Sequence, residues 1–116
     1  MPDKRIRHVI ADMLSAIDHV ERALAGRDQS ALSNDPILRA AIERFIEIVS
    51  EGSRHLPETM KQAHPDIPWR RVADIGNHLR HRYWAVEEDI VWGVATVRLP
   101  ELREVLRRLA DDPDLR

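Results

Sequence analysis

The chain has 116 residues, which is enough for one domain and too few for two hydrophobic cores of ordinary size. Its 18 Lys and Arg residues are balanced by 20 Asp and Glu residues, so any contact with nucleic acid needs a local basic patch. The absence of cysteine excludes disulfides, thiol catalysis and Cys-ligated zinc. No apolar run approaches the roughly 20 residues of a membrane span, and residues 1–5 show no signal-peptide layout. We therefore expect a single cytoplasmic domain over residues 1–116 that makes no membrane contact.

The first periodic segment predicts an amphipathic helix. Its apolar residues recur at intervals of three and four positions: Ile6, Ile10, Met13, Ile17, Val20 and Leu24. Gly26 is typical of a helix end. The polar residues 27–34 that follow are predicted to form mostly a loop.

A second, long helix is predicted to begin at Pro36, with Asp35 as its N-cap. Gly52 falls on the inner face of this helix, where the missing side chain would let another helix come close. Pro57 or the proline-containing segment 64–68 must end it. Its predicted core face consists of Leu38, Ala41, Ile42, Phe45, Ile48 and Val49, continuing towards Leu56.

Three further helices complete the predicted fold. The third runs from about Trp69 to Tyr83, and a fifth is opened by Pro100. The segment after Ala110 is predicted to fray. The core faces of the three helices are Val72, Ile75 and Leu79; Ile90, Val91, Val94 and Val97; and Leu102, Val105, Leu106 and Leu109. With no strand signal, the sequence predicts an all-α, up-and-down bundle of about five helices.

The third helix carries the densest set of polar residues. Four arginines (Arg70, Arg71, Arg80 and Arg82) accompany a single acid, Asp74. At about 100° per residue, a face containing Arg70, Asp74, Asn77 and His81 lies opposite the apolar face, so it is predicted to be exposed or covered only by a second molecule. A helix face of this kind is most often simply solvated.

The chemistry that this face could perform is proton transfer beside a phosphate. Asn77 and His81 are one turn apart, a histidine titrates near neutral pH, and arginines hold phosphate and stabilise developing negative charge. This combination fits phosphodiester cleavage without a metal. Asp74, His78 and His81 could alternatively be metal ligands, but His78 is rotated by roughly 40–60° from the other two and no further ligands complete the shell. We expect no metal and no cofactor.

Several segments resemble the HepT-like branch of the HEPN superfamily. The resemblance rests on Ile67–Arg70, on Ile75–Tyr83, on Val86 with Ile90–Trp92, on Pro100–Leu102, and on the segment from Ser50 to Leu56. These motifs occur in the family's order and spacing along nearly the whole chain.

This resemblance implies a helical bundle that forms a homodimer. The family's toxins are metal-independent endoribonucleases of type VII toxin–antitoxin pairs, each paired with an MNT-type nucleotidyltransferase antitoxin. Their motif is Arg, four residues, His, one residue, Tyr. The His maps onto His81, the polar residue after the Arg onto Asn77, and the Tyr, which the antitoxin modifies with AMP, onto Tyr83. Such a modification adds bulk and negative charge beside the histidine.

One position departs from the family pattern, because its Arg corresponds to Gly76. We expect Arg80 and Arg82, or an Arg of a second subunit, to hold the phosphate instead. Arg71 and His78 also satisfy a looser spacing of Arg, six residues, His. Loss of one positioned electrostatic donor costs on the order of 10²–10³ in rate.

Three hypotheses follow. In the first, the chain is an RNA-cleaving toxin in which His81, Asn77, Arg80 and Arg82 are catalytic and Tyr83 is the modification site. In the second, it is a catalytically silent binding subunit of a nucleotidyltransferase. In the third, it is only a helical dimerisation module.

Overall fold

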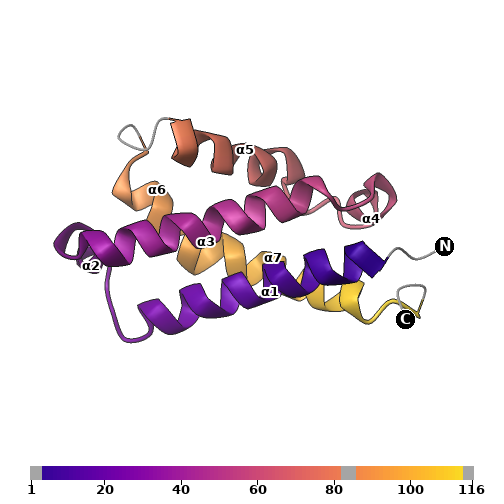
Figure 1. Ribbon diagram of the computed structural model, residues 1–116, viewed down its shortest axis with the longest axis horizontal. Coiled ribbons are helices and arrows are strands. Elements are labelled where there is room, and N and C mark those ends of the chain that lie inside the picture. The colour runs from indigo at the N-terminus through magenta and orange to yellow at the C-terminus, as the bar shows by residue number, and fades with distance from the viewer. Residues whose placement is uncertain (1–3, 82–85, 114–116) are drawn as a thin grey trace.

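The computed structural model describes residues 4–81 and 86–113 of the chain. Within them there are α-helices and one π-helical segment, η2, and no strand (Figure 1). In chain order these are α1 (Lys4–Leu24), α2 (Ser30–Asn34), α3 (Pro36–Arg54), α4 (Glu58–Gln62), α5 (Trp69–His81), α6 (Glu88–Gly93), η2 (Val94–Arg98) and α7 (Leu99–Ala110).

Helix α3 is the centre of the bundle. It packs against α1 on one side and against α5 on the other, and α1 also packs against α7. Successive long helices run in opposite directions, and the start of α1 lies at the same end of the bundle as the end of α7 (Figure 1). The predicted all-α, up-and-down bundle is confirmed, and it is the architecture that the HepT-like resemblance implies.

The predicted apolar faces form most of the hydrophobic core. Ile10, Met13, Ile17 and Val20 of α1 are buried, as are Ile42 and Val49 of α3 and Leu102, Leu106 and Leu109 of α7. The pattern omitted Ile46, which is 1% exposed. Burial of such side chains contributes about 1.5–3 kcal/mol each relative to exposure, so these three helices supply the main stabilisation of the bundle.

The predicted helix boundaries hold where a local capping signal exists. The Asp35 side chain accepts a hydrogen bond from the Leu38 N–H at 3.0 Å, and Pro36 occupies the first turn of α3. Gly26, just after α1, adopts a φ of +73°, which is the left-handed conformation that glycine permits. Helix α7 ends at Ala110.

The prediction of a loop over residues 27–34 is wrong for its second half, which forms the short helix α2. The Asp28 carboxylate accepts hydrogen bonds from the backbone N–H and the hydroxyl of Ser30, which satisfies donors at the start of this turn. Leu32 is 1% exposed and anchors the turn to the core. A second short helix, α4, follows Pro57.

The predicted break at Pro100 is also wrong, because α6, η2 and α7 follow one another without interruption. A proline inside an α-helix lacks one donor and clashes with the carbonyl four residues earlier. The widened π-helical turns of η2 lie immediately before Leu99 and Pro100, and such turns accommodate this kind of conflict.

Burial along α6 and η2 differs from the predicted face. Val91 and Ala95 are buried, at 1% and 5% exposure, whereas Ile90 and Val97 are 49% and 50% exposed. Because the core contacts only the side containing Val91 and Ala95, the other side of this segment keeps apolar groups at the surface.

Candidate functional site

Helix α5 is attached to α3 by a close contact between Gly76 and Ser50. The Gly76 N–H donates a hydrogen bond to Ser50 Oγ at 3.1 Å, and Ser50 Oγ donates to the Ala73 carbonyl oxygen at 2.9 Å. A Cβ added at Gly76 would lie 2.6 Å from Ser50 Oγ and 2.9 Å from Ser50 Cβ. Gly76 is therefore a packing glycine.

Arg54 adds a second link between the same two helices. Its Nε and Nη2 atoms both donate to the Ala73 carbonyl oxygen, at 3.2 and 2.6 Å. A guanidinium holds one acceptor from two directions, which limits rotation of α5 about its axis. Ser50 and Arg54 thus fix which side of α5 faces outward.

That outward side carries the predicted site residues. Asn77 and His81 are exposed, as are Arg70 and Asp74, so the predicted orientation of this face is confirmed. His81 is the last residue of α5, and Arg80 beside it is exposed as well. Two of the predicted site residues, Arg82 and Tyr83, lie outside the described residues.

Gly76 itself does not belong to that face. It is buried between α5 and α3, so a long side chain at this position would start inside the helix contact. The position onto which the resemblance maps the family's Arg is therefore occupied by a residue that brings two helices together. The roles of Ser50 and Arg54 could not be predicted from the sequence, because a serine or arginine in a helix gives no signal of its tertiary partner.

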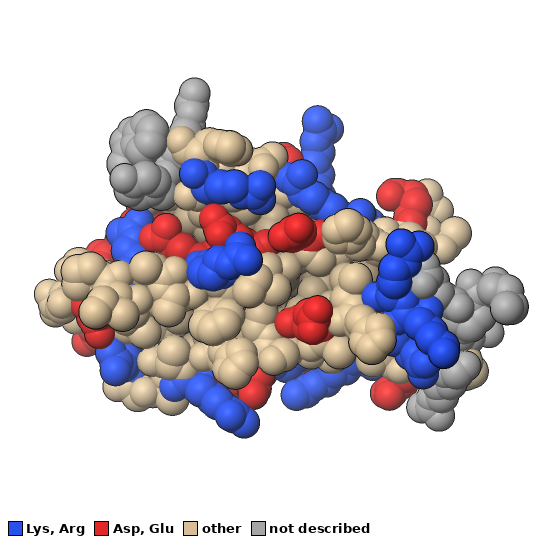
Figure 2. Space-filling view, in the orientation of Figure 1, with Lys and Arg blue, Asp and Glu red and all other residues tan. Residues whose placement is uncertain are grey.

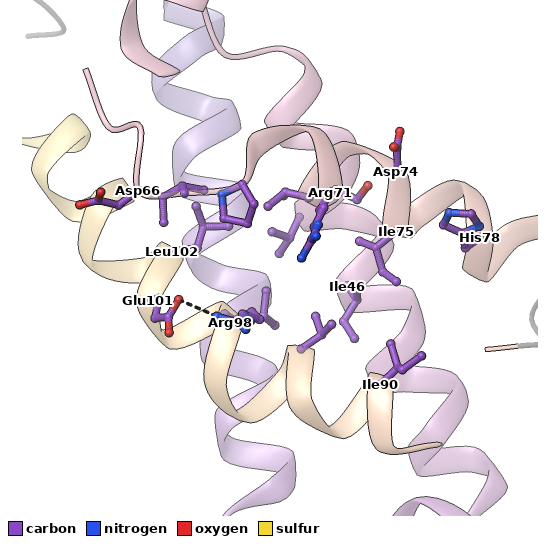
Figure 3. A pocket seen from close by; sticks show the side chains of 17 residues that line it. Ile46, Asp66, Arg71, Asp74, Ile75, His78, Ile90, Arg98, Glu101 and Leu102 are labelled. Carbon is purple, nitrogen blue, oxygen red and sulfur yellow. Dashed lines mark ion pairs between the residues drawn. The ribbon is translucent and has the colours of Figure 1, made fainter. Parts of the chain in front are cut away.

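A cleft borders α5 where this helix faces the segment from α6 to α7. It has a volume of about 550 Å³ and lies between α5, α3 and the segment from α6 to α7 (Figure 3). Arg71 and His78, the pair with the looser Arg–His spacing, both line it. Their positions are seven residues apart, or about 10 Å along the helix axis, so they flank the cleft without adjoining each other.

The face presented by α3 and α5 in Figure 2 has mixed charge. Acidic groups lie along the boundary between the two helices, with basic groups on either side of them. Glu43 and Glu47 of α3 pair with Arg39 and Arg44, at 2.7 and 3.3 Å. Arg39 and Arg44 are therefore already paired within α3.

Within the described residues, no group of three or more His, Asp or Glu side chains could hold a metal ion. The metal-site alternative built on Asp74, His78 and His81 has no support from their arrangement. In the same part of the chain, no helix has both the length and the apolar character to cross a membrane.

Comparisons with known proteins agree in naming ribonucleases. A relative from Thermococcus cleftensis named "Probable ribonuclease HepT" is 29% identical over 100 residues, covering 86% of this chain and 88% of the relative. A protein of Methanocaldococcus jannaschii whose name gives it as a candidate RNase is 25% identical over 112 residues, covering 97% of each chain. A Caldanaerobacter subterraneus protein named in the same way is 26% identical over 108 residues, covering 93% of each. No solved structure matches the chain.

The family described as Ribonuclease HepT-like matches residues 13–109. This span contains the hydrogen-bonded contact between Ser50 and Gly76, the whole of α5 and the continuous segment from α6 into α7. The chain therefore belongs to the ribonuclease HepT-like family.

Proposed function

We propose that this protein is a metal-independent endoribonuclease that acts as a HepT-like toxin. The observation that carries the proposal is the exposure of Asn77 and His81, one turn apart on a helix that is clamped to the core, in a chain of a ribonuclease family. An exposed histidine on a fixed helix can reach a substrate strand without any rearrangement of the bundle.

In the proposed reaction, His81 is the general acid or base. A ribose 2′-hydroxyl loses its proton, its oxygen attacks the adjacent phosphorus, and the 5′-oxygen leaves with a proton, giving a cyclic phosphate and a free 5′-hydroxyl. His81 transfers one of these two protons, and Asn77 orients the phosphate or the ribose from the preceding turn. Arg80 and Arg82 stabilise the charge that develops on the phosphate oxygens.

The proposed partners follow the family resemblance. The chain forms a homodimer in the cytoplasm, and an MNT-type nucleotidyltransferase antitoxin transfers AMP to Tyr83. Tyr83 is two residues after His81 in sequence, so the added phosphate brings negative charge and bulk close to the group that must meet an RNA phosphate. Repulsion and steric exclusion together would stop cleavage.

The test is cleavage of a mixed RNA pool by the purified protein in EDTA. Wild type is compared with His81→Ala and with His8→Ala, a matched control in which an exposed histidine on α1 is removed. We expect His81→Ala to lose on the order of 10²–10⁴ in rate and His8→Ala to keep the wild-type rate. Equal rates for wild type and His81→Ala would remove His81 from the mechanism.

A second candidate function rests on Gly76. Because this residue is buried against Ser50 where the family has an arginine, the chain can instead be a catalytically silent partner that presents Tyr83 to a nucleotidyltransferase. This alternative predicts a stable complex with that enzyme and no RNA cleavage by the isolated protein. Cleavage that depends on His81 would exclude it.

A further inference from the structure

The cleft beside α5 combines an apolar interior with charged groups at its rim. Ile46 and Val49 of α3, Val72 and Ile75 of α5, and Val94 of η2 line it. Its volume of about 550 Å³ lies within the range of roughly 300–1,000 Å³ that is typical of sites for small organic groups. A planar ring system of the size of a nucleobase fits such a space.

Arg71 is the cation that faces this apolar interior. Its side chain extends from α5 into the opening (Figure 3), it is exposed, and it has no hydrogen-bond or ion-pair partner among the described residues. The other cation of the rim, Arg98, is paired with Glu101 at 3.5 Å. A free guanidinium above an apolar surface favours a ligand with an anionic group next to an apolar or aromatic body.

Three carboxylates also lie at the rim, namely Asp66, Asp74 and Glu101. Figure 3 shows Asp66 and Asp74 directed away from the interior, and Glu101 is the partner of Arg98. The charge that an entering group meets first is therefore that of Arg71. Nucleotides have this combination of a flat apolar base and a phosphate.

The cleft is placed to act together with the proposed reaction site. His78 lines it and precedes His81 by three residues, so the two side chains are neighbours on the helix surface. Arg71 precedes His81 by ten residues, or about 15 Å along the helix axis. An RNA strand that lies along α5 would thus reach the cleft within a few nucleotides of His81.

We propose that this cleft is a nucleotide subsite for the RNA substrate, in which a base a few nucleotides away from the cleaved bond enters between α5 and η2 and its phosphate binds Arg71. The inference rests on the proposed ribonuclease function. It adds a binding subsite, distinct from the reacting groups, through which the enzyme selects a base a few nucleotides away from the cleavage position.

The first experiment measures binding of a 2′-O-methyl hexaribonucleotide, which cannot be cleaved through its 2′-oxygen, by isothermal titration calorimetry. Arg71→Gln is compared with Arg70→Gln, a neighbouring exposed arginine that does not line the cleft. Both variants lose one positive charge, so the general attraction for RNA falls equally. We expect Arg71→Gln to bind roughly tenfold more weakly than Arg70→Gln, because only Arg71 contacts the phosphate directly. Equal binding by the two variants would overturn the subsite.

A second pair of variants tests the apolar part of the cleft. Ile90 lines its mouth and Val97 does not, although both belong to the same continuous helical segment and are exposed to the same extent, at 49% and 50%. We expect Ile90→Asp to weaken binding of the hexanucleotide strongly and Val97→Asp to leave it near the wild-type value. We also expect an abasic site in the hexanucleotide to weaken binding by wild type and to have no further effect on Ile90→Asp.

These experiments distinguish a failure of the proposed subsite from a failure of the proposed function. If wild type binds the hexanucleotide through the cleft but cleaves no RNA, the ribonuclease assignment fails and the subsite stands. If cleavage depends on His81 while all four variants bind equally, the subsite fails and the ribonuclease stands. Sedimentation velocity identifies the rival occupant, since conversion of an oligomer to a monomer by Ile90→Asp, with no loss of RNA affinity per chain, would assign the cleft to a second copy of the chain.

Discussion

The hydroxyl of Ser50 lies between α3 and α5 and makes hydrogen bonds to two backbone groups within one turn of α5. It accepts the Gly76 N–H at 3.1 Å and donates to the Ala73 carbonyl at 2.9 Å. Only a glycine at position 76 leaves room for this oxygen, since a Cβ there would lie 2.6 Å from it. The two residues therefore determine together how closely α5 approaches the core and which of its faces is exposed.

Replacement of Ser50 by alanine is expected to lower the free energy of unfolding by about 1–3 kcal/mol, because Ser50 is 1% exposed and loss of its hydroxyl leaves backbone groups of α5 without this partner. Urea denaturation measures the effect. Ser53→Ala is the matched control, since Ser53 is equally buried but its hydroxyl donates to the Ser50 carbonyl within α3. If Ser53→Ala lowers the free energy of unfolding as much as Ser50→Ala does, the hydrogen bonds from Ser50 to α5 contribute no more to stability than a bond within α3.

Substitution of Gly76 by alanine is expected to destabilise the protein, although alanine is the better helix former by about 1 kcal/mol. The added methyl group collides with Ser50, and either α5 or the serine must shift. Thermal unfolding of Gly76→Ala should give a lower Tm than wild type. Gly93→Ala, where a Cβ meets nothing within 4 Å, should raise the Tm. A raised Tm in both variants would contradict the packing role of Gly76.

The N-cap of α3 predicts a moderate stability loss in Asp35→Ala. The carboxylate accepts the Leu38 N–H at 3.0 Å, and removal of such a cap costs about 0.5–2 kcal/mol. Asp35→Asn, which keeps an accepting oxygen, should recover most of this loss in the same denaturation experiment. Equal stability of the alanine and asparagine variants would mean that the cap contributes nothing.

The turn before α2 predicts a pH-dependent contribution. Hydrogen bonds from the Ser30 hydroxyl and then from the Ser30 backbone N–H lower the pKa of Asp28 below its ordinary value. Because the folded-state pKa is the lower one, this contribution is complete above the ordinary pKa of about 3.9 and is lost as the pH falls through the folded-state value. Carboxyl carbon NMR titration of Asp28 checks the direction of the shift.

Two serine variants test whether the Ser30 hydroxyl is what lowers the pKa of Asp28. Ser30→Ala removes the larger of the two causes, so the pKa of Asp28 should rise towards its ordinary value. Ser33→Ala removes a hydroxyl that donates to the Ser30 carbonyl and does not contact Asp28, so the pKa should stay lowered. An unchanged pKa in Ser30→Ala would refute this account of the turn.

Local sequence was sufficient to predict the long helices and much of their core. The apolar spacing of α1, α3 and α7 placed Ile10, Val49 and Leu106 inside, because the α-helical period fixes which residues share a face. The same period predicted the exposed side of α5 with Asn77 and His81. The close approach at Gly52 was also predictable, and a Cβ there would lie 2.5 Å from Met13 Cγ.

Only the tertiary structure decided which groups surround the exposed side of α5. Residues that are distant in sequence make the hydrogen bonds from Ser50 and Arg54 to the Ala73 carbonyl oxygen. The cleft that Arg71 lines is likewise formed by separate helices. The exposure of Ile90 likewise depends on how far the core extends over α6. A periodic pattern determines the direction in which a side chain points from its own helix. Which residue of another helix it contacts is determined by how the separate helices pack, and no local sequence signal encodes that packing.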